Sequence, residues 1–481
     1  MIDGKSRQAP GTGSVRPGHP LAGWAAVGLL LCAYAVSFLD RQIISLLVQP
    51  LKADLGISDT QIGILQGPAF GVFYAVLGLP LGWLADRVNR VRLVALAITL
   101  WSAMTIASGL ANSFEGLLLA RIGVGVGEAA LVPAAVSLLS DLFRPERRAL
   151  PLSIFTSGIS VGLGLALVLG GAFVTWTETG AVGALPWLGR WLEAQQPWQA
   201  TFVLAGLVGL PVAALVLLLD EPRAVGAGAG AGVGVGVEVG MDADAGATDP
   251  HQPVSGALRY LRERRDFFVP MLLGVSALYI LSSAVGAWMP ALFIRRFDWT
   301  PQQVGQSLGA WIMLVAISGN LLSGVLTQAF SRRGWIYAPV RTMLVGAALI
   351  LPTATLAPLL PDAEFVMAGV LAMYFAIALT FGIATTAFVA VTPPRLRGQV
   401  VAIYLLIGNL VGLGLGPPLV GLLVDRGGAT FGAVGPALAG VCVVVAAPAV
   451  LLLQRARRAF AGAVPLSPAA PAPGAPHSTR Q

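Results

Sequence analysis

The sequence places four charged residues inside long apolar stretches: Asp40, Arg41, Arg121 and Glu128. A charge at the centre of a bilayer costs roughly 2.5–3.5 kcal/mol on insertion scales, so such side chains mark ion, proton or substrate pathways. Arg121 and Glu128 are seven residues apart, which on a helix puts them on nearly the same face and about 10 Å apart along the axis. That distance is too long for a direct pair and leaves room for Asp40, Arg41 or a ligand between them.

Two interpretations of these four residues remain open. In the functional one, Asp40 and Glu128 accept protons, and Arg41 or Arg121 binds an anionic group. A carboxylate that alternates between a dry setting and an arginine neighbour alternately binds and releases a proton, and each proton that moves inward gains about 2.3 kcal/mol per 100 mV of membrane potential. In the structural one, the four form a static ion-pair network that holds the first and fourth apolar helices together.

The composition around these charges is that of a membrane protein. Of the 481 residues, 56% are hydrophobic and only 11% are charged, whereas a soluble domain carries about a quarter charged residues. The net charge of +7 comes from basic residues spread over short loops, so we expect no nucleic-acid partner. We expect a monomer surrounded by membrane lipid.

The cysteines and histidines of the chain are not spaced as they would be in a metal site or a catalytic site. Cys32 and Cys442 lie far apart within apolar stretches and should pack as small apolar side chains. The histidines His19, His251 and His477 lie in polar tails or in the central linker. With no nucleophile–base pair and no GxxxxGK[ST] motif, we expect no metal, no cofactor, no enzymatic activity and no self-contained ATP pump.

Twelve apolar stretches are long enough to cross a bilayer. Each should be helical, because hydrocarbon offers backbone N–H and C=O groups no other partner. The fold class expected is an all-α membrane protein with twelve transmembrane helices in two six-helix, pseudo-symmetric halves. The approximate limits are 24–48, 60–84, 92–111, 115–140, 149–176, 199–219, 267–294, 304–329, 336–358, 364–392, 398–424 and 431–454.

Lysine and arginine are distributed asymmetrically between the loops. With both termini in the cytoplasm, the inner segments hold 23 of these residues and the outer loops hold 5. This positive-inside pattern predicts a multi-pass protein of the plasma membrane, in a bacterium the inner membrane. It also supports the number of helices, because one missed helix would invert every later loop.

The chain divides into five parts. The central linker contains a low-complexity stretch of small residues, which should be flexible, followed by a short basic amphipathic helix at 257–266. An internal similarity supports two halves, because Gly82 to Arg90 and Gly324 to Arg332 follow corresponding helices. The parts are a cytoplasmic tail (1–23), a first half (24–219), a cytoplasmic linker (220–266), a second half (267–454) and a disordered tail (455–481).

The segment GWLADRVNRVR, from Gly82 to Arg92, is the most specific motif of the chain. It resembles the G-x-L-a-D-r-x-g-r-k/r signature between the second and third helices of major facilitator transporters, with Asn89 in place of the usual glycine. In that family the aspartate and the arginines latch the cytoplasmic faces of the two halves together. The resemblance implies that Gly82, Asp86, Arg87 and Arg90 form a cytoplasmic gate.

Within that superfamily the chain is most similar to the Spinster-like branch. The similarity is carried by FLDR at 38–41, by Arg121 with GVGVGE at 123–128, and by WMP at 288–290. It implies a proton-linked carrier for amphipathic or lipid-like organic molecules, with the aspartate, arginines and glutamate involved in coupling.

The function we expect is secondary active transport of a small organic molecule, amphipathic or anionic, by alternating access and with proton coupling. The alternatives are a uniporter, a sodium-coupled carrier, or a membrane receptor or scaffold that only binds a ligand. Polar side chains seldom face lipid and aromatic ones often line cavities, so six further residues are candidates for the cavity wall. They are Phe38, Gln66, Tyr74, Trp288, Asn320 and Asn409.

Overall fold

The computed structural model describes residues 20–144, 147–186, 188–222, 255–335 and 337–463. Within these ranges the chain is helical and contains no β-strand, and twelve helices are long and apolar enough to cross a membrane. Both predictions, the all-α fold class and the twelve spans, are confirmed.

Several membrane-crossing segments are broken into two or three helices. The first half contains α1 (Pro20–Leu46), α2 (Val48–Leu55), α3 (Asp59–Gln66), α4 (Pro68–Ala85), α5 (Arg90–Gly109), α6 (Phe114–Glu128), α7 (Leu131–Leu142), α8 (Ala149–Glu178), η2 (Ala181–Ala184), α9 (Gly189–Glu193) and α10 (Pro197–Val216). The second half contains α12 (Arg265–Phe297), α13 (Pro301–Val304), η3 (Gly305–Gly309), α14 (Ala310–Arg332), α15 (Ala338–Leu356), η4 (Ala357–Leu359), α16 (Ala363–Phe381), α17 (Ala384–Ala390), η5 (Pro394–Leu396), α18 (Arg397–Arg426), α19 (Gly428–Phe431) and α20 (Val434–Ala463). Between the halves lies α11 (Ser255–Glu263).

Local sequence explains where key helices start. Asn89, the residue that departs from the family glycine, is the N-cap of α5, and its Oδ1 accepts the N–H of Arg92 at 2.8 Å. Asparagine is among the best N-cap residues, because its side chain satisfies one of the unpaired N–H groups of the first turn. The substitution therefore supports the loop and begins the third membrane-crossing helix.

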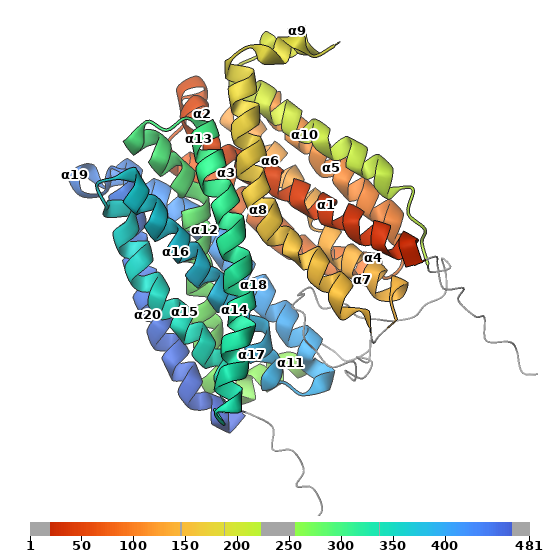
Figure 1. The fold of residues 1–481 in the computed structure, drawn as a ribbon, viewed down its shortest axis with the longest axis vertical. Coiled ribbons are helices and arrows are strands. Elements are labelled where there is room, and N and C mark those ends of the chain that lie inside the picture. Colours follow the sequence, from red (N-terminus) through yellow and green to blue (C-terminus); the bar gives the residue numbers. More distant parts are fainter. Residues whose placement is uncertain (1–19, 145–146, 187, 223–254, 336, 464–481) are drawn as a thin grey trace, which may run out of the picture.

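In the described part of the chain, the main contacts between the two halves lie toward one end of the molecule. We call it the α9 end, and the opposite end, where α10 stops and α11 begins, the linker end. At the α9 end, α3 and α4 pack against α18, and α8 packs against α13, η3 and α14. A Cβ atom on Gly63 would lie 2.6 Å from the Pro417 carbonyl oxygen, and one on Gly171 would lie 2.4 Å from that of Pro301. Small residues thus let the backbones touch, and from these contacts α8 and α14 diverge toward the linker end (Figure 1).

The structure adds two details to the expected parts of the chain, whose boundaries stay predictions. The amphipathic helix is present as α11, where the Tyr260 hydroxyl donates to the Val391 carbonyl and burial raises the pKa of Tyr260. The last helix continues past residue 454 to Ala463, because Phe460 is buried and its ring lies 5.6 Å from that of Phe267. Most of the expected tails and the low-complexity linker (1–19, 464–481 and 223–254) lie outside the described residues.

Candidate functional site

The central pair of the site joins α1 to α6. Arg41 Nε donates to Glu128 Oε2 at 2.6 Å, and a terminal guanidinium nitrogen contacts the same oxygen. Glu128 is the last residue of α6, at the point where this membrane-crossing segment breaks before α7. The Glu128 side chain is fully buried, whereas that of Arg41 retains 18% of its exposure. Arg41 is therefore the member of the pair that a ligand can reach.

Three aromatic rings surround the Arg41 guanidinium. Its carbon lies 5.0 Å from the ring centroid of Phe38, 4.6 Å from that of Phe70 and 4.7 Å from that of Tyr74. A cation over an aromatic face gains about 0.5–2 kcal/mol, more where water is excluded. Phe38 and Tyr74 are among the cavity candidates predicted from the sequence, and Phe70 precedes Tyr74 by one helical turn on α4. The cage fixes the orientation of Arg41 without neutralising its charge.

Arg121 and Asp40 lie beside this pair and are almost completely buried. Arg121 Nη1 donates to the backbone carbonyl of Asp40 at 2.8 Å, not to its carboxylate. Neither Asp40 carboxylate oxygen makes a hydrogen bond of good geometry among the described residues, although the Thr105 hydroxyl lies beside this carboxyl group. A buried carboxyl group in this state is costly as an anion. The site therefore contains an ion pair, in which Arg41 contacts only one of the two Glu128 carboxylate oxygens, next to an acid with spare bonding capacity.

The other cavity candidates are less concentrated. Gln66 is partly buried and its Nε2 has no partner among the described residues, while Asn409 donates to the Leu405 carbonyl within its own helix. Asn320 is exposed on α14. Trp288 requires a correction: it is fully buried, and its indole N–H donates to the Pro417 carbonyl at 2.9 Å, so it has no surface with which to line a cavity.

The gate motif is anchored mainly through Arg90, which is fully buried at the start of α5. Its side chain donates to Glu221 Oε1 at 3.0 and 2.5 Å, to Asp141 Oδ2 at 2.6 Å and to Ser137. Ser137 and Asp141 belong to α7 of the first half, and Glu221 follows α10 at the start of the linker. In this conformation Arg90 therefore ties α5 to α7 and to the end of α10.

The remaining motif residues lie nearer the surface. Arg87 is exposed, stacks 3.7 Å from the Trp83 ring centroid and donates to the Trp83 carbonyl. Asp86 follows the last residue of α4, and Gly82 faces Pro133 at ordinary van der Waals distance. Their expected role in latching the two halves together stays a prediction.

The Arg90 cluster leads to a stability prediction. Arg90→Gln removes a buried guanidinium and its charged hydrogen bonds to Glu221 and Asp141, which costs about 1.5–3 kcal/mol, so we expect the Tm of the purified protein to fall by roughly 5 °C. Arg87→Gln is the matched control, since an exposed stacking interaction contributes about 0.5–1 kcal/mol. Equal melting temperatures for the two variants in a thermal-shift assay would show that Arg90 does not organise this end.

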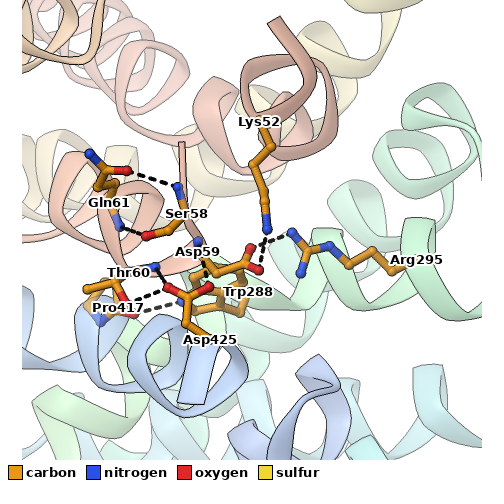
Figure 2. Close-up of polar contacts among 9 residues, drawn as sticks. All are labelled: Lys52, Ser58, Asp59, Thr60, Gln61, Trp288, Arg295, Pro417 and Asp425. Carbon is orange, nitrogen blue, oxygen red and sulfur yellow. Dashed lines mark hydrogen bonds and ion pairs between the residues drawn. The ribbon is translucent and has the colours of Figure 1, made fainter. Parts of the chain in front are cut away.

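A second charged cluster, not predicted from the sequence, closes the α9 end (Figure 2). Asp59, at the start of α3, is almost buried and pairs with two cations. Lys52 Nζ lies 2.5 Å from its Oδ2, and Arg295 Nη2, from α12 of the opposite half, lies 2.5 Å from its Oδ1. One carboxylate thus holds together a cation from each half. We call these three residues the end clamp.

Asp425 of α18 reinforces the end clamp from the second half. Its carboxylate accepts the backbone N–H groups of Asp59 at 3.0 Å and of Thr60 at 2.7 Å, and the Thr60 hydroxyl at 2.6 Å. An anion at the start of a helix satisfies unpaired N–H groups and complements the helix dipole. Within the first half, Ser58 and Gln61 form a capping box at the same helix start. That S-x-x-Q pattern is the one sequence signal pointing to this place.

Comparisons with known proteins agree with this architecture. Residues 30–410 match the family model described as Major Facilitator Superfamily. An MFS-type efflux pump of Mycolicibacterium smegmatis is 29% identical over 409 residues, covering 84% of this chain and 85% of that protein. Protein spinster of Drosophila melanogaster is 24% identical, covering 84% of this chain and 62% of that protein.

Solved structures give the same result. The crystal structure of a bacterial homologue of the human lysosomal transporter Spinster, inward-facing and unoccupied, has a TM-score of 0.74 and 27% identity. The match covers 94% of this chain and 100% of that one. The inward-facing occupied form of such a homologue has a TM-score of 0.71.

Proposed function

The chain belongs to the Major Facilitator Superfamily as a Spinster-like membrane transporter, not an enzyme, and from this premise we propose that it moves a small organic molecule by proton-coupled alternating access. The substrate class we propose is amphipathic or anionic. One observation carries the proposal: a partly exposed arginine, caged by aromatic rings, is paired with a fully buried glutamate.

The geometry supports an exchange of partners at Arg41. An anionic group that enters the site competes with Glu128 for the guanidinium, since carboxylate and phosphate groups both form charge-assisted hydrogen bonds with arginine. Glu128, once released, is a buried carboxyl group without a cation and takes up a proton. The proton and the anion then occupy the site together, so the net charge of the four residues plus the bound anion equals that of the four residues alone. The Phe38, Phe70 and Tyr74 rings offer an apolar surface to the rest of an amphipathic substrate.

The conformation and orientation follow from the same reasoning. The end clamp and the small-residue contacts close the α9 end, while the halves diverge toward the linker end. The excess of basic residues on the linker side favours a cytoplasmic linker and termini. We therefore propose an inward-facing state in a bacterial inner membrane, as in the similar structures solved in that state.

Proteoliposomes test the coupling directly. The probes are radiolabelled galactonate, a small organic anion chosen because one relative is named a probable L-galactonate transporter of Escherichia coli, and lysophosphatidylglycerol, a single-chain anionic amphiphile. We expect an imposed pH gradient, and not a sodium gradient, to drive accumulation of one of them. Accumulation driven by sodium would identify a sodium-coupled carrier, equilibration without accumulation a uniporter, and binding without any flux a receptor.

A further inference from the structure

A pocket separate from the central site opens at the α9 end of the second half. Its volume is about 510 Å³, within the range of ligand-binding cavities. The wall is formed by the end of α12, by η4 and by the residues that lead into α20. The lining residues are Leu292, Arg295, Arg296, Leu359, Gly432, Ala433, Val434, Gly435 and Pro436.

The charge of this pocket favours an anion. Two arginines line it, and none of the described lining residues is acidic. Arg296 donates from Nη1 to the Pro358 carbonyl at 2.7 Å and pairs with no carboxylate in the described part of the chain, so its charge is not neutralised. The thirty-residue helix α20 also begins here without an acidic residue in its first turn, which leaves the positive end of its dipole uncompensated. Arginine guanidinium groups and helix N-termini both commonly bind phosphate groups.

The position of the pocket makes it accessible from lipid. It lies at the ends of membrane-crossing helices, the level at which phospholipid headgroups lie. Leu359, which lines the pocket, is largely exposed, and so are Leu356 on α15 and Val444 on α20. Leu356 and Val444 thus give α15 and α20 exposed apolar surface, where acyl chains would pack below a bound headgroup.

Arg295 connects the pocket to the end clamp. Its Nη2 holds Asp59 across the two halves at 2.5 Å, while its Nε is buried without a hydrogen-bond partner among the described residues. An anion in the pocket would bind the unused edge of this guanidinium and draw its charge away from Asp59. We propose that the pocket binds a phosphate-bearing anion, such as the headgroup of an anionic phospholipid, and that its occupancy loosens the Arg295–Asp59 link and favours opening of the α9 end.

Spin-label distances test this proposal without a transport substrate. Spin labels are attached at Glu115→Cys and Glu364→Cys, both exposed at the α9 ends of opposite halves. Cys32 and Cys442 are first replaced by alanine. Pulsed electron paramagnetic resonance then measures the distance between the labels, which increases when the α9 end opens. Nanodiscs of phosphatidylcholine are compared with nanodiscs containing increasing phosphatidylglycerol, and with phosphatidylcholine nanodiscs in inorganic phosphate. Arg296→Gln removes one pocket cation but leaves the end clamp intact. Arg190→Gln removes an exposed charge of α9, at the same end but outside the pocket.

We expect phosphatidylglycerol to raise the population with the longer distance, and Arg296→Gln to require on the order of tenfold more of this lipid for the same rise. The Arg190→Gln variant should respond like the unchanged protein. A rise with inorganic phosphate alone would identify a soluble anion as the ligand, and a rise with the lipid alone a headgroup. No rise with either, or equal responses of the Arg296→Gln and Arg190→Gln variants, would overturn the proposal.

Discussion

Glu128→Gln is expected to abolish accumulation of substrate driven by a pH gradient. One pH unit corresponds to about 1.4 kcal/mol per proton, so a carrier that moves one proton with each substrate accumulates it about tenfold across such a gradient. Without a titratable group at residue 128 the substrate only equilibrates. The loss is therefore from about tenfold accumulation to none.

Replacement of Glu128 by glutamine removes the titratable group but keeps the contact between α1 and α6. Its side-chain oxygen still accepts the Arg41 Nε–H that Glu128 accepts at 2.6 Å, so the α1–α6 contact persists while the charge and the proton do not. Exchange of labelled for unlabelled substrate, which needs no net proton movement, should continue in this variant. The measurement is uptake of the active probe into proteoliposomes, with and without a gradient.

Glu115→Gln is the matched control, because Glu115 is an exposed glutamate in the first turn of the same helix. It should accumulate substrate as the unchanged protein does. Gradient-driven accumulation retained by Glu128→Gln would mean that the Arg41–Glu128 pair is a static link between two helices, the structural interpretation.

The second large effect is expected from Asp59→Asn, which should shift the protein toward a state open at the α9 end. Asp59 holds Lys52 and Arg295 from opposite halves, and its removal leaves two cations facing each other. A hydrogen bond to a charged group contributes about 1.5–3 kcal/mol, so losing the link across the halves should change the ratio of the two states ten- to a hundredfold.

The spin-label pair at 115 and 364 measures this shift as growth of the longer distance. Asp54→Asn is the control, since Asp54 lies at the same end but accepts the Trp198 indole N–H within the first half, a bond that an asparagine oxygen can also accept. If Asp59→Asn and Asp54→Asn give the same distances, the end clamp does not hold the α9 end shut.

The fold was predictable because each helix is determined by local sequence. Hydrocarbon forces the apolar stretches to be helical, and the alternation of lysine and arginine between loops supports their number and predicts their direction. The pairing of Asp59 with Arg295 was not predictable in the same way. These residues are 236 positions apart, both lie near helix ends where charges are common, and they come from opposite halves of the chain.

The central site was predictable in its members but not in its bonds. Asp40, Arg41, Arg121 and Glu128 stand out because charge in an apolar stretch is costly. The sequence does not reveal that Arg121 donates to a backbone carbonyl while Arg41 pairs with Glu128, because this depends on the rotation of α1 against α6. Arg90 shows the opposite limitation: a loop motif indicated a gate, and packing buried this arginine among partners on α7 and just after α10.

Proton movement during substrate entry is the most direct test of coupling through the two buried acids. Proteoliposomes that enclose a pH-sensitive dye receive substrate without any imposed gradient, and the internal pH is followed for the unchanged protein and for the variant Asp40→Asn/Glu128→Gln. Coupling predicts internal acidification that accompanies uptake by the unchanged protein and is absent from the double variant. Equal acidification in both, or uptake by the unchanged protein with no pH change, would contradict it.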